Sequence, residues 1–164
     1  MAIITAGSAA ILRDGSIGNN RTVIGFNGAA DGTGTITSIQ IYLTGGVDSG
    51  LLTRMGVFAP TGGANFICRS WELVGVITSG STQTIPVNLA VVIGDYIGFY
   101  LNEGTCQRQA AGGNGMYWLD NDQTEAGEQT FTLSAARILS LYGTGVTLSK
   151  GGNFIPRLIA MGQL

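Results

Sequence analysis

The feature that most constrains the fold is an alternation of side chains within residues 85–104. An apolar run ends at Ile93 and is followed by Gly94-Asp95, a pair typical of a tight turn. After the turn, apolar positions alternate with other residues from Tyr96 to Leu101. A period of two is that of a strand with one face on a core, whereas a helix repeats about every 3.6 residues. The segment therefore predicts two β-strands joined by a tight turn.

The same alternation recurs along the chain, and no segment shows a helical period. Within residues 34–44, for example, Ile39, Ile41 and Leu43 share one face, which predicts a core-facing side. The sequence thus predicts an all-β protein. The expected strands are residues 3–5, 9–13, 22–26, 34–44, 51–59, 65–79 with a break, 81–89, 96–102, 115–119, 128–134, 137–142 and 154–161.

The connecting segments are rich in glycine, which accounts for 27 of the 164 residues and follows no fixed period. Short strands separated by such turns at intervals of roughly 8–12 residues are typical of antiparallel sandwiches and barrels. Uneven strand lengths and long glycine-rich loops favour Greek-key crossings over uniform hairpins. We therefore expect one domain, residues 1–164, folded as an antiparallel two-sheet β-sandwich of jelly-roll type.

Composition excludes several classes of partner. Only 11% of the residues are charged, against roughly 25% in an average domain, and the net charge is −2. No basic field is available for a phosphate backbone, so nucleic acid is not expected as a partner. We expect no membrane partner, because no apolar stretch is long enough to span a bilayer. The N-terminus lacks the basic region of a secretory signal, which favours synthesis in a cytoplasm.

The basic residues are seven arginines and one lysine. Arginine suits planar, hydrogen-bonded contacts at interfaces better than lysine does, so the bias is compatible with an interface.

Cysteine and histidine content argues against common catalytic centres. Cys68 and Cys106 are more simply interpreted as buried apolar residues than as a disulfide, which is the alternative. They form no Cys-x-x-Cys pair, so zinc is not expected. The chain has no histidine, which removes Ser-His-Asp triads, Cys-His pairs and imidazole metal ligands. We therefore expect no enzymatic activity and no cofactor.

The densest acidic group lies in residues 120–128. Asp120, Asp122 and Glu125 carry the oxygen donors that calcium prefers. The segment lacks the glycine of an EF-hand loop, however, and no helix is expected beside it, so a solvated connection is the favoured interpretation. A carboxylate-only glycoside hydrolase is a third hypothesis, but the spacing does not place two carboxylates across a cleft.

Two neighbouring aromatic residues are the candidates for binding carbohydrate. Tyr117 and Trp118 follow the glycine-rich residues 110–115 and are expected at a rim, where a flat ring can stack on a sugar. Asp95, by contrast, is expected to be structural and to cap its own turn, while Gly94 adopts a dihedral that other residues avoid.

Four segments carry a resemblance to a known module: residues 92–100, 113–120, 127–133 and 138–145. They are similar to a jelly-roll module of uncharacterised proteins from bacteriophages and environmental viral sequences. The resemblance covers roughly residues 34–145 and consists of turns and strands, so it brings no catalytic or ligand residue. It implies a virion component, either a capsid decoration or cement protein or a domain of a tail or fibre. By analogy it also implies a homo-oligomer, with a trimer fitting local three-fold capsid positions.

These observations together lead us to expect a non-enzymatic viral structural protein, located in the virion, that binds the major capsid protein or another virion subunit. The end segments, residues 1–13 and 153–164, are expected to add strands to neighbouring subunits or to lie across them. The alternative is a carbohydrate-binding module of a host-recognition tail or fibre protein, with or without calcium. The expected partner contacts are Ile3, Ile4, Ile11, Leu12, Phe154, Ile155 and Leu158.

Overall fold

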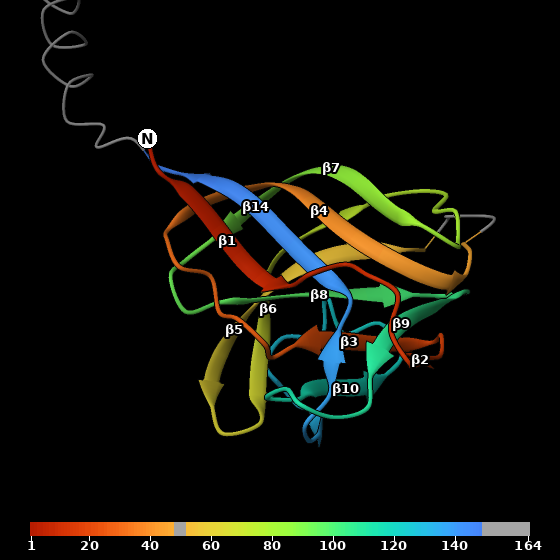
Figure 1. The fold of residues 1–164 in the computed structure, drawn as a ribbon. Coiled ribbons are helices and arrows are strands. Elements are labelled where there is room, and N and C mark those ends of the chain that lie inside the picture. Colours follow the sequence, from red (N-terminus) through yellow and green to blue (C-terminus); the bar gives the residue numbers. More distant parts are fainter. Residues whose placement is uncertain (48–51, 149–164) are drawn as a thin grey trace, which may run out of the picture.

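A computed structural model describes residues 1–47 and 52–148 of the chain. Within this part the chain forms β-strands and connecting segments, and it contains no helix that could cross a membrane. The strands build two antiparallel sheets that pack against each other (Figure 1). The predicted all-β, two-sheet sandwich is therefore confirmed. The jelly-roll connectivity is not established by the observed strand orders and stays a prediction.

The first sheet is organised around the long strand β4. β14 and β7 pair with opposite edges of β4, and β9 pairs with its far end. The full order is β1-β14-β4-β9-β13, with β7 beside β4 and β2 beside β9. The strands of this sheet are β1 (Ile3–Ser8), β2 (Gly15–Ile17), β4 (Gly34–Gly45), β7 (Thr82–Val91), β9 (Thr105–Gln109), β13 (Ile138–Leu139) and β14 (Leu141–Thr147).

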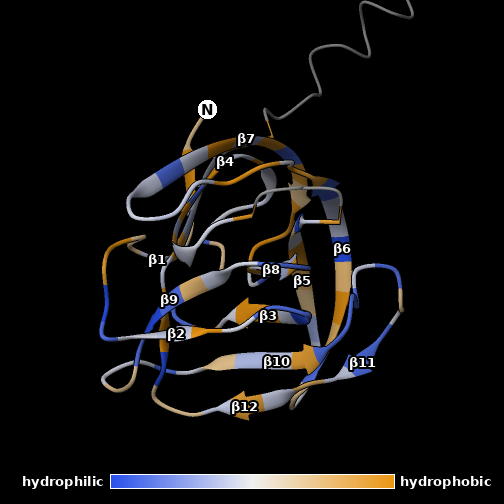
Figure 2. Ribbon diagram, turned by 90° about the vertical axis from the view of Figure 1, so that its right-hand side faces the viewer, coloured by the Kyte–Doolittle hydropathy of each residue, from blue (hydrophilic) through white to orange (hydrophobic). Residues whose placement is uncertain are grey.

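The second sheet curls until its two edges meet. Its order is β11-β6-β5-β8-β3-β10-β12, so β11 and β12 stand at opposite edges although only Phe131 separates them in sequence. β11 pairs with β6 and β12 pairs with β10, which closes the sheet into a small barrel (Figure 2). Its strands are β3 (Arg21–Gly25), β5 (Arg54–Gly62), β6 (Asn65–Leu73), β8 (Tyr96–Leu101), β10 (Met116–Asp120), β11 (Gln129–Thr130) and β12 (Thr132–Ser134).

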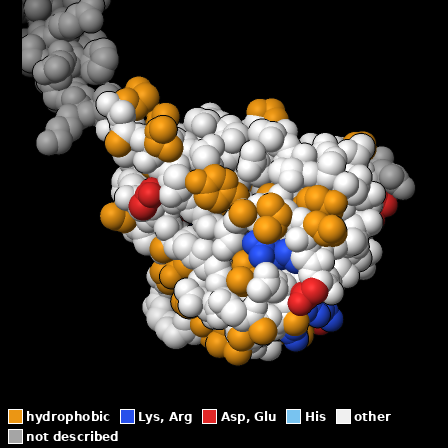
Figure 3. All heavy atoms as spheres, viewed as in Figure 1, with side chains coloured by type: hydrophobic (Ala, Val, Ile, Leu, Met, Phe, Trp, Pro, Cys, Tyr) orange, Lys and Arg blue, Asp and Glu red, His pale blue; other side chains and the backbone are white. Residues whose placement is uncertain are grey.

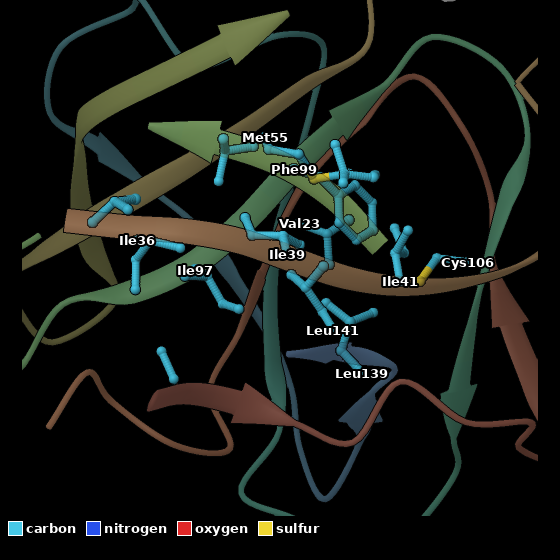
Figure 4. Packing of buried hydrophobic residues seen from close by; sticks show 14 of the residues in the cluster. Val23, Ile36, Ile39, Ile41, Met55, Ile97, Phe99, Cys106, Leu139 and Leu141 are labelled. Atoms are coloured by element: carbon cyan, nitrogen blue, oxygen red, sulfur yellow. The ribbon is translucent and has the colours of Figure 1, made fainter. Parts of the chain in front are cut away.

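A large aliphatic core fills the space between the two sheets. Alternate residues of β4 and β7 face it, including Ile39, Ile41 and Leu43, as the sequence predicts. From the second sheet, Ile97 and Phe99 point into the same layer (Figure 4). Burying each of these side chains contributes about 1.5–3 kcal/mol, so this core is the main source of stability.

A second, aromatic core fills the barrel. The ring centroid of Phe66 lies 4.9 Å from that of Tyr117 and 5.7 Å from that of Phe131. Phe131, from the segment that closes the barrel, also meets Phe58 of β5 edge to face. Gly98 permits this packing, because a Cβ there would lie 2.9 Å from the Phe58 ring. The strands β3, β5 and β8 are therefore covered on both faces, and Tyr96, on the face of residues 96–102 opposite Ile97 and Phe99, packs against the barrel core.

Several predicted boundaries differ from the structure. Residues 9–13 are not a strand; Arg13 holds them through hydrogen bonds to Gln107, Gln109 and Ser140. Residues 128–134 divide into β11 and β12, and residues 137–142 divide into β13 and β14. The prediction missed β2 and β9, because neither has an apolar alternation that marks a strand. The predicted strand 154–161 lies outside the described residues.

The two cysteines lie in different cores. Cys106 is fully buried between the sheets, and Cys68 packs half-buried against the aromatic core of the barrel. Both thiols are free, so the alternative of a disulfide is not realised. Burial raises the pKa of the Cys68 thiol to about 12, and burial also raises the pKa of Cys106.

Replacing Phe131 with alanine is expected to destabilise the protein by about 3–5 kcal/mol, because the change empties the barrel at the point of its closure. Chemical unfolding monitored by circular dichroism measures this loss. Thr132→Ala is the matched control, since its exposed side chain lies next to Phe131 and its loss is expected to cost no more than about 0.5 kcal/mol. Equal effects of the two substitutions would contradict the closure.

Alkaline pH is expected to lower the free energy of unfolding. The folded thiols hold their protons above the ordinary pKa of 9.0, whereas the unfolded thiols release them, so stability falls as pH rises from about 9 toward 12. Burial raises the pKa of Tyr96 and Tyr100 in the same direction. Urea unfolding at a series of pH values tests this. The double variant Cys68→Ser, Cys106→Ala should lose part of the pH slope, and an unchanged slope would assign the effect elsewhere.

Candidate functional site

A hollow of about 230 Å³ lies where the first sheet meets the barrel, and we call it the arginine hollow. Figure 2 shows β2 beside β3, with β10 below them, in this region. Strands of both sheets contribute to the wall, so the hollow depends on the packing of one sheet against the other. The hollow is lined by Ser16, Ile17, Gly18, Arg21, Arg108, Met116, Trp118, Ser134 and Arg137.

Three arginines from separate elements line this hollow. Arg21 begins β3, Arg108 lies on β9, and Arg137 precedes β13. Nε of Arg21 pairs with the exposed carboxylate of Asp120 at 3.3 Å. Arg137 Nη1 donates to the backbone carbonyl of Ala110 at 3.4 Å. Among residues 1–47 and 52–148, no carboxylate forms an ion pair with Arg108 or Arg137.

Trp118 forms one wall of the hollow, and its neighbour Tyr117 does not. Adjacent residues of a strand face opposite sides, so Trp118 packs toward the core between the sheets while Tyr117 points into the barrel. The guanidinium of Arg21 lies 4.5 Å from the centre of the Trp118 ring, within the range of a cation–π contact. The predicted rim position is therefore wrong for Tyr117, which is buried, and only Trp118 remains part-exposed at a hollow.

The predicted calcium ligands are engaged by arginines. Asp120 turns to Arg21, whereas Asp122 and Glu125 are both bound by Nη1 of Arg54, at 3.2 Å and 2.9 Å. Arg54 in turn lies 3.9 Å above the ring of Trp71. The described residues contain no group of three or more acidic, cysteine or histidine side chains placed to hold a metal ion. Arg54, the first residue of β5, thus holds Asp122 and Glu125 against the start of that strand.

Asp95 has the structural role that the sequence predicts. Its Oδ2 accepts a hydrogen bond from the backbone N–H of Val92 at 2.8 Å, and Gly94 has a φ of 94°, so the predicted capped turn is confirmed. The same carboxylate, only 3% exposed, also binds Arg69 Nε at 2.6 Å. This hydrogen bond raises the pKa of Arg69. Asp95 is committed to the turn and is not part of a carboxylate pair across a cleft.

Of the predicted partner contacts, the structure leaves some exposed and buries one. Ile3, Ile11 and Leu12 are exposed, as an interface requires. Ile4, the second residue of β1, is fully buried, so its prediction as a contact is wrong. The period of the strand turns its side chain toward the core. The remaining predicted contacts, Phe154, Ile155 and Leu158, lie outside the described residues.

Ile3 belongs to a group of exposed apolar side chains, the terminal apolar patch, formed by Met1, Ile3, Ile93 and Leu148. These side chains are between 64% and 92% exposed. These side chains come from three segments: the N-terminus, the 92–95 turn and the end of β14. The N–H groups of Leu148 and Ile93 both donate to Thr33, and Thr147 forms hydrogen bonds with Ala2, so the three segments lie together. Figure 3 shows hydrophobic side chains at the corner where Figure 1 places the N-terminus.

The free edge of β1 is protected against pairing with another strand. The N–H of Thr5 donates to Asp31 at 2.7 Å, and the N–H of Gly7 donates to the carbonyl of Gly28 at 2.9 Å. The Thr5 hydroxyl also donates to Asp31. These two hydrogen bonds lower the pKa of Asp31, and the one from the backbone N–H has the larger effect. Because these groups are occupied, the edge is blunted in the way that natural sheets avoid edge-to-edge association. Residues 3–8 pair with β14 of their own sheet.

Comparisons of the chain with protein-family models, curated proteins and solved structures gave no match. Arg108 and Arg137 are not recognisable as site residues from the sequence, because 28 residues lie between them and no motif joins them. The excess of arginine over lysine was the one signal in that direction.

Calcium is expected to leave the melting temperature unchanged, because Arg54 occupies the space between the carboxylates of Asp122 and Glu125. Differential scanning calorimetry in millimolar calcium and in excess EDTA measures this. A calcium-dependent rise that disappears in the Asp122→Asn variant would show instead that the segment binds the ion.

Proposed function

We propose that the protein is a non-enzymatic virion structural protein, a capsid decoration protein that binds the shell and stabilises it. The terminal apolar patch supports this proposal most directly. Large apolar side chains from the N-terminus, the 92–95 turn and the end of β14 meet at one corner of the molecule and are left in solvent. An exposed apolar group of this kind is typical of a surface that another protein covers.

The rest of the surface supports an adhesive role. Only 11% of the residues are charged, and interface cores are depleted in charged residues relative to other surface. Ile11 and Leu12 add further exposed apolar side chains in the segment that Arg13 holds in place. A segment fixed in this way loses little conformational entropy when a partner binds, which favours affinity.

Because the edge of β1 is protected, we propose that the N-terminal segment contacts a partner through its side chains and not by adding a strand. Strand addition to β1 is disfavoured, because Asp31 and Gly28 already occupy its outward N–H groups. Side-chain packing on the terminal apolar patch takes its place. A homo-oligomer such as a trimer on the capsid is compatible with this arrangement, since copies related by symmetry can present the same patch.

The protein is expected in purified particles of the virus that encodes it, at a copy number comparable with that of the shell subunits. Quantitative mass spectrometry of such particles measures this. Adding recombinant protein to particles that lack it should restore binding, and Ile3→Asp or Ile93→Asp should weaken binding by about tenfold or more, because each variant buries a charge in an apolar contact.

Val76→Asp is the matched control for these two variants. Val76 is as exposed as Ile93 but adjoins the Val47–Ile77 bridge, at the end of β4 opposite the terminal apolar patch. It should bind particles as the unmodified protein does. Absence of the protein from particles would contradict the proposed function, and equal binding by all three variants would contradict the role of the patch.

A second candidate function, carbohydrate binding by a host-recognition tail or fibre protein, is favoured by one observation. Trp118 lines a hollow that also presents the hydroxyls of Ser16 and Ser134, a combination suited to a sugar ring. A response to free glycosides separates this candidate from the decoration protein, which has no need of a sugar.

A further inference from the structure

The arginine hollow carries more positive charge than its surroundings balance. Arg21, Arg108 and Arg137 line it, and Asp120 is the carboxylate that pairs with one of them. Asp120 Oδ1 accepts from Nε of Arg21 at 3.3 Å, and both side chains are partly exposed. Three guanidiniums against one carboxylate leave a net positive charge in a protein whose total charge is negative.

The other described ion pairs show that this imbalance is local. Arg54 is matched by Asp122 and Glu125, and Arg69 is matched by Asp95. Asp14, the remaining carboxylate near Ala110, accepts from the backbone N–H of that residue at 2.9 Å. Figure 3 shows basic side chains on the visible face, with acidic side chains close to the lower group. Within the part of the chain that the structure describes, the hollow therefore brings three arginines together with one ion-paired carboxylate, Asp120.

The remainder of the wall is suited to a ring with hydroxyl groups. Ile17 and Met116 are buried and line the hollow together with Trp118. Ser16 and Ser134 also line it, and a serine hydroxyl can both donate and accept a hydrogen bond. The volume of about 230 Å³ is below the roughly 300–1,000 Å³ of sites for drug-sized ligands, so the hollow suits one small unit.

We propose that the arginine hollow binds a single acidic sugar unit, whose anionic group is held by Arg108 and Arg137 and whose ring lies against the stacked pair of Arg21 and Trp118. This assignment rests on the carbohydrate-binding candidate and gives its ligand class. A carboxylate is planar and fits the fork of a guanidinium with two parallel hydrogen bonds, which a lysine would not provide. A bare inorganic anion would leave Ile17 and Met116 without a contact. Outside the hollow, Arg54 and Arg69 are matched by carboxylates, which disfavours an extended nucleic acid.

Titration with methyl β-glucuronide and methyl β-glucoside tests the proposal, because the two ligands differ only in having a carboxylate or a hydroxymethyl group. The Trp71→Phe background leaves Trp118 as the only tryptophan, so its fluorescence reports the hollow. The glucuronide is expected to bind at least about tenfold more tightly than the glucoside, and its binding should weaken as ionic strength rises. Isothermal titration calorimetry on the unmodified protein gives the same comparison without the background substitution.

Variants assign the effect to the hollow. Arg108→Gln and Arg137→Gln should each weaken glucuronide binding by about tenfold or more, and Arg108→Lys should recover only part of it, because the charge returns without the fork. Lys150→Gln makes the same change in net charge two residues beyond Leu148 and should bind as the unmodified protein does. Unchanged circular dichroism and melting temperature confirm that the variants remain folded.

Each other result overturns the proposal in a distinct way. Equal binding of glucuronide and glucoside would keep the carbohydrate candidate and remove the acidic ligand. Binding of neither would remove both, while the decoration protein would be unaffected. Competition by inorganic phosphate at the affinity of the glucuronide would identify a general anion site without sugar recognition, and tighter binding of a short single-stranded oligonucleotide would replace the sugar with nucleic acid.

Discussion

The closure of the second sheet by residues 129–134 is the constraint on which the rest of the structure depends. This segment pairs with β6 at one end and with β10 at the other, and Phe131 between them points into the barrel. The closure removes both edges of the sheet, which exposed strands otherwise leave open to association. It also covers both faces of β3, β5, β8 and β10, so each of these strands contributes to the aromatic core on one side and to the aliphatic core on the other.

The same closure positions the candidate site. β12 follows directly after Phe131, and its pairing with β10 brings Ser134 beside Met116 while Trp118 faces the first sheet. Arg108 and Arg137 approach from the first sheet, where β13 pairs with β9. The arginine hollow is thus a product of how the barrel and the flat sheet meet, and no single loop carries it. A site fixed by strands of two sheets is held more rigidly than one built on a loop.

The fold class could be predicted because alternation is a local property. The regular pattern of β7 and the face shared by Ile39, Ile41 and Leu43 both appear in the structure as expected. The barrel could not be predicted in the same way. Residues 129–134 pair with β6 at one edge of the sheet and with β10 at the other, and no local sequence pattern indicates such a pairing. Two consecutive apolar residues, Val23 and Ile24, indicate a strand that is covered on both faces. In the structure these two residues do lie in different cores.

The site was less accessible from the sequence than the fold. Trp118 was found, but its pairing with Tyr117 assumed that adjacent aromatic residues share a surface, which the period of a strand forbids. The acidic segment attracted a calcium hypothesis because the arginine that binds it, Arg54, lies far away in the sequence. Arg108 lies on β9, a strand without alternation, so neither its position nor its neighbours could be inferred.

Native-state hydrogen exchange at the amide of Phe131 tests the closed barrel most directly. This N–H donates to the carbonyl of Ala64 at 2.8 Å and so reports the junction of β11 with β6. If the barrel is closed, the Phe131 amide should exchange only with global unfolding, at the free energy measured for the central amides of β4. Exchange by local opening, at a much lower free energy than in β4, would show that residues 129–134 fray from the sheet and would contradict the account.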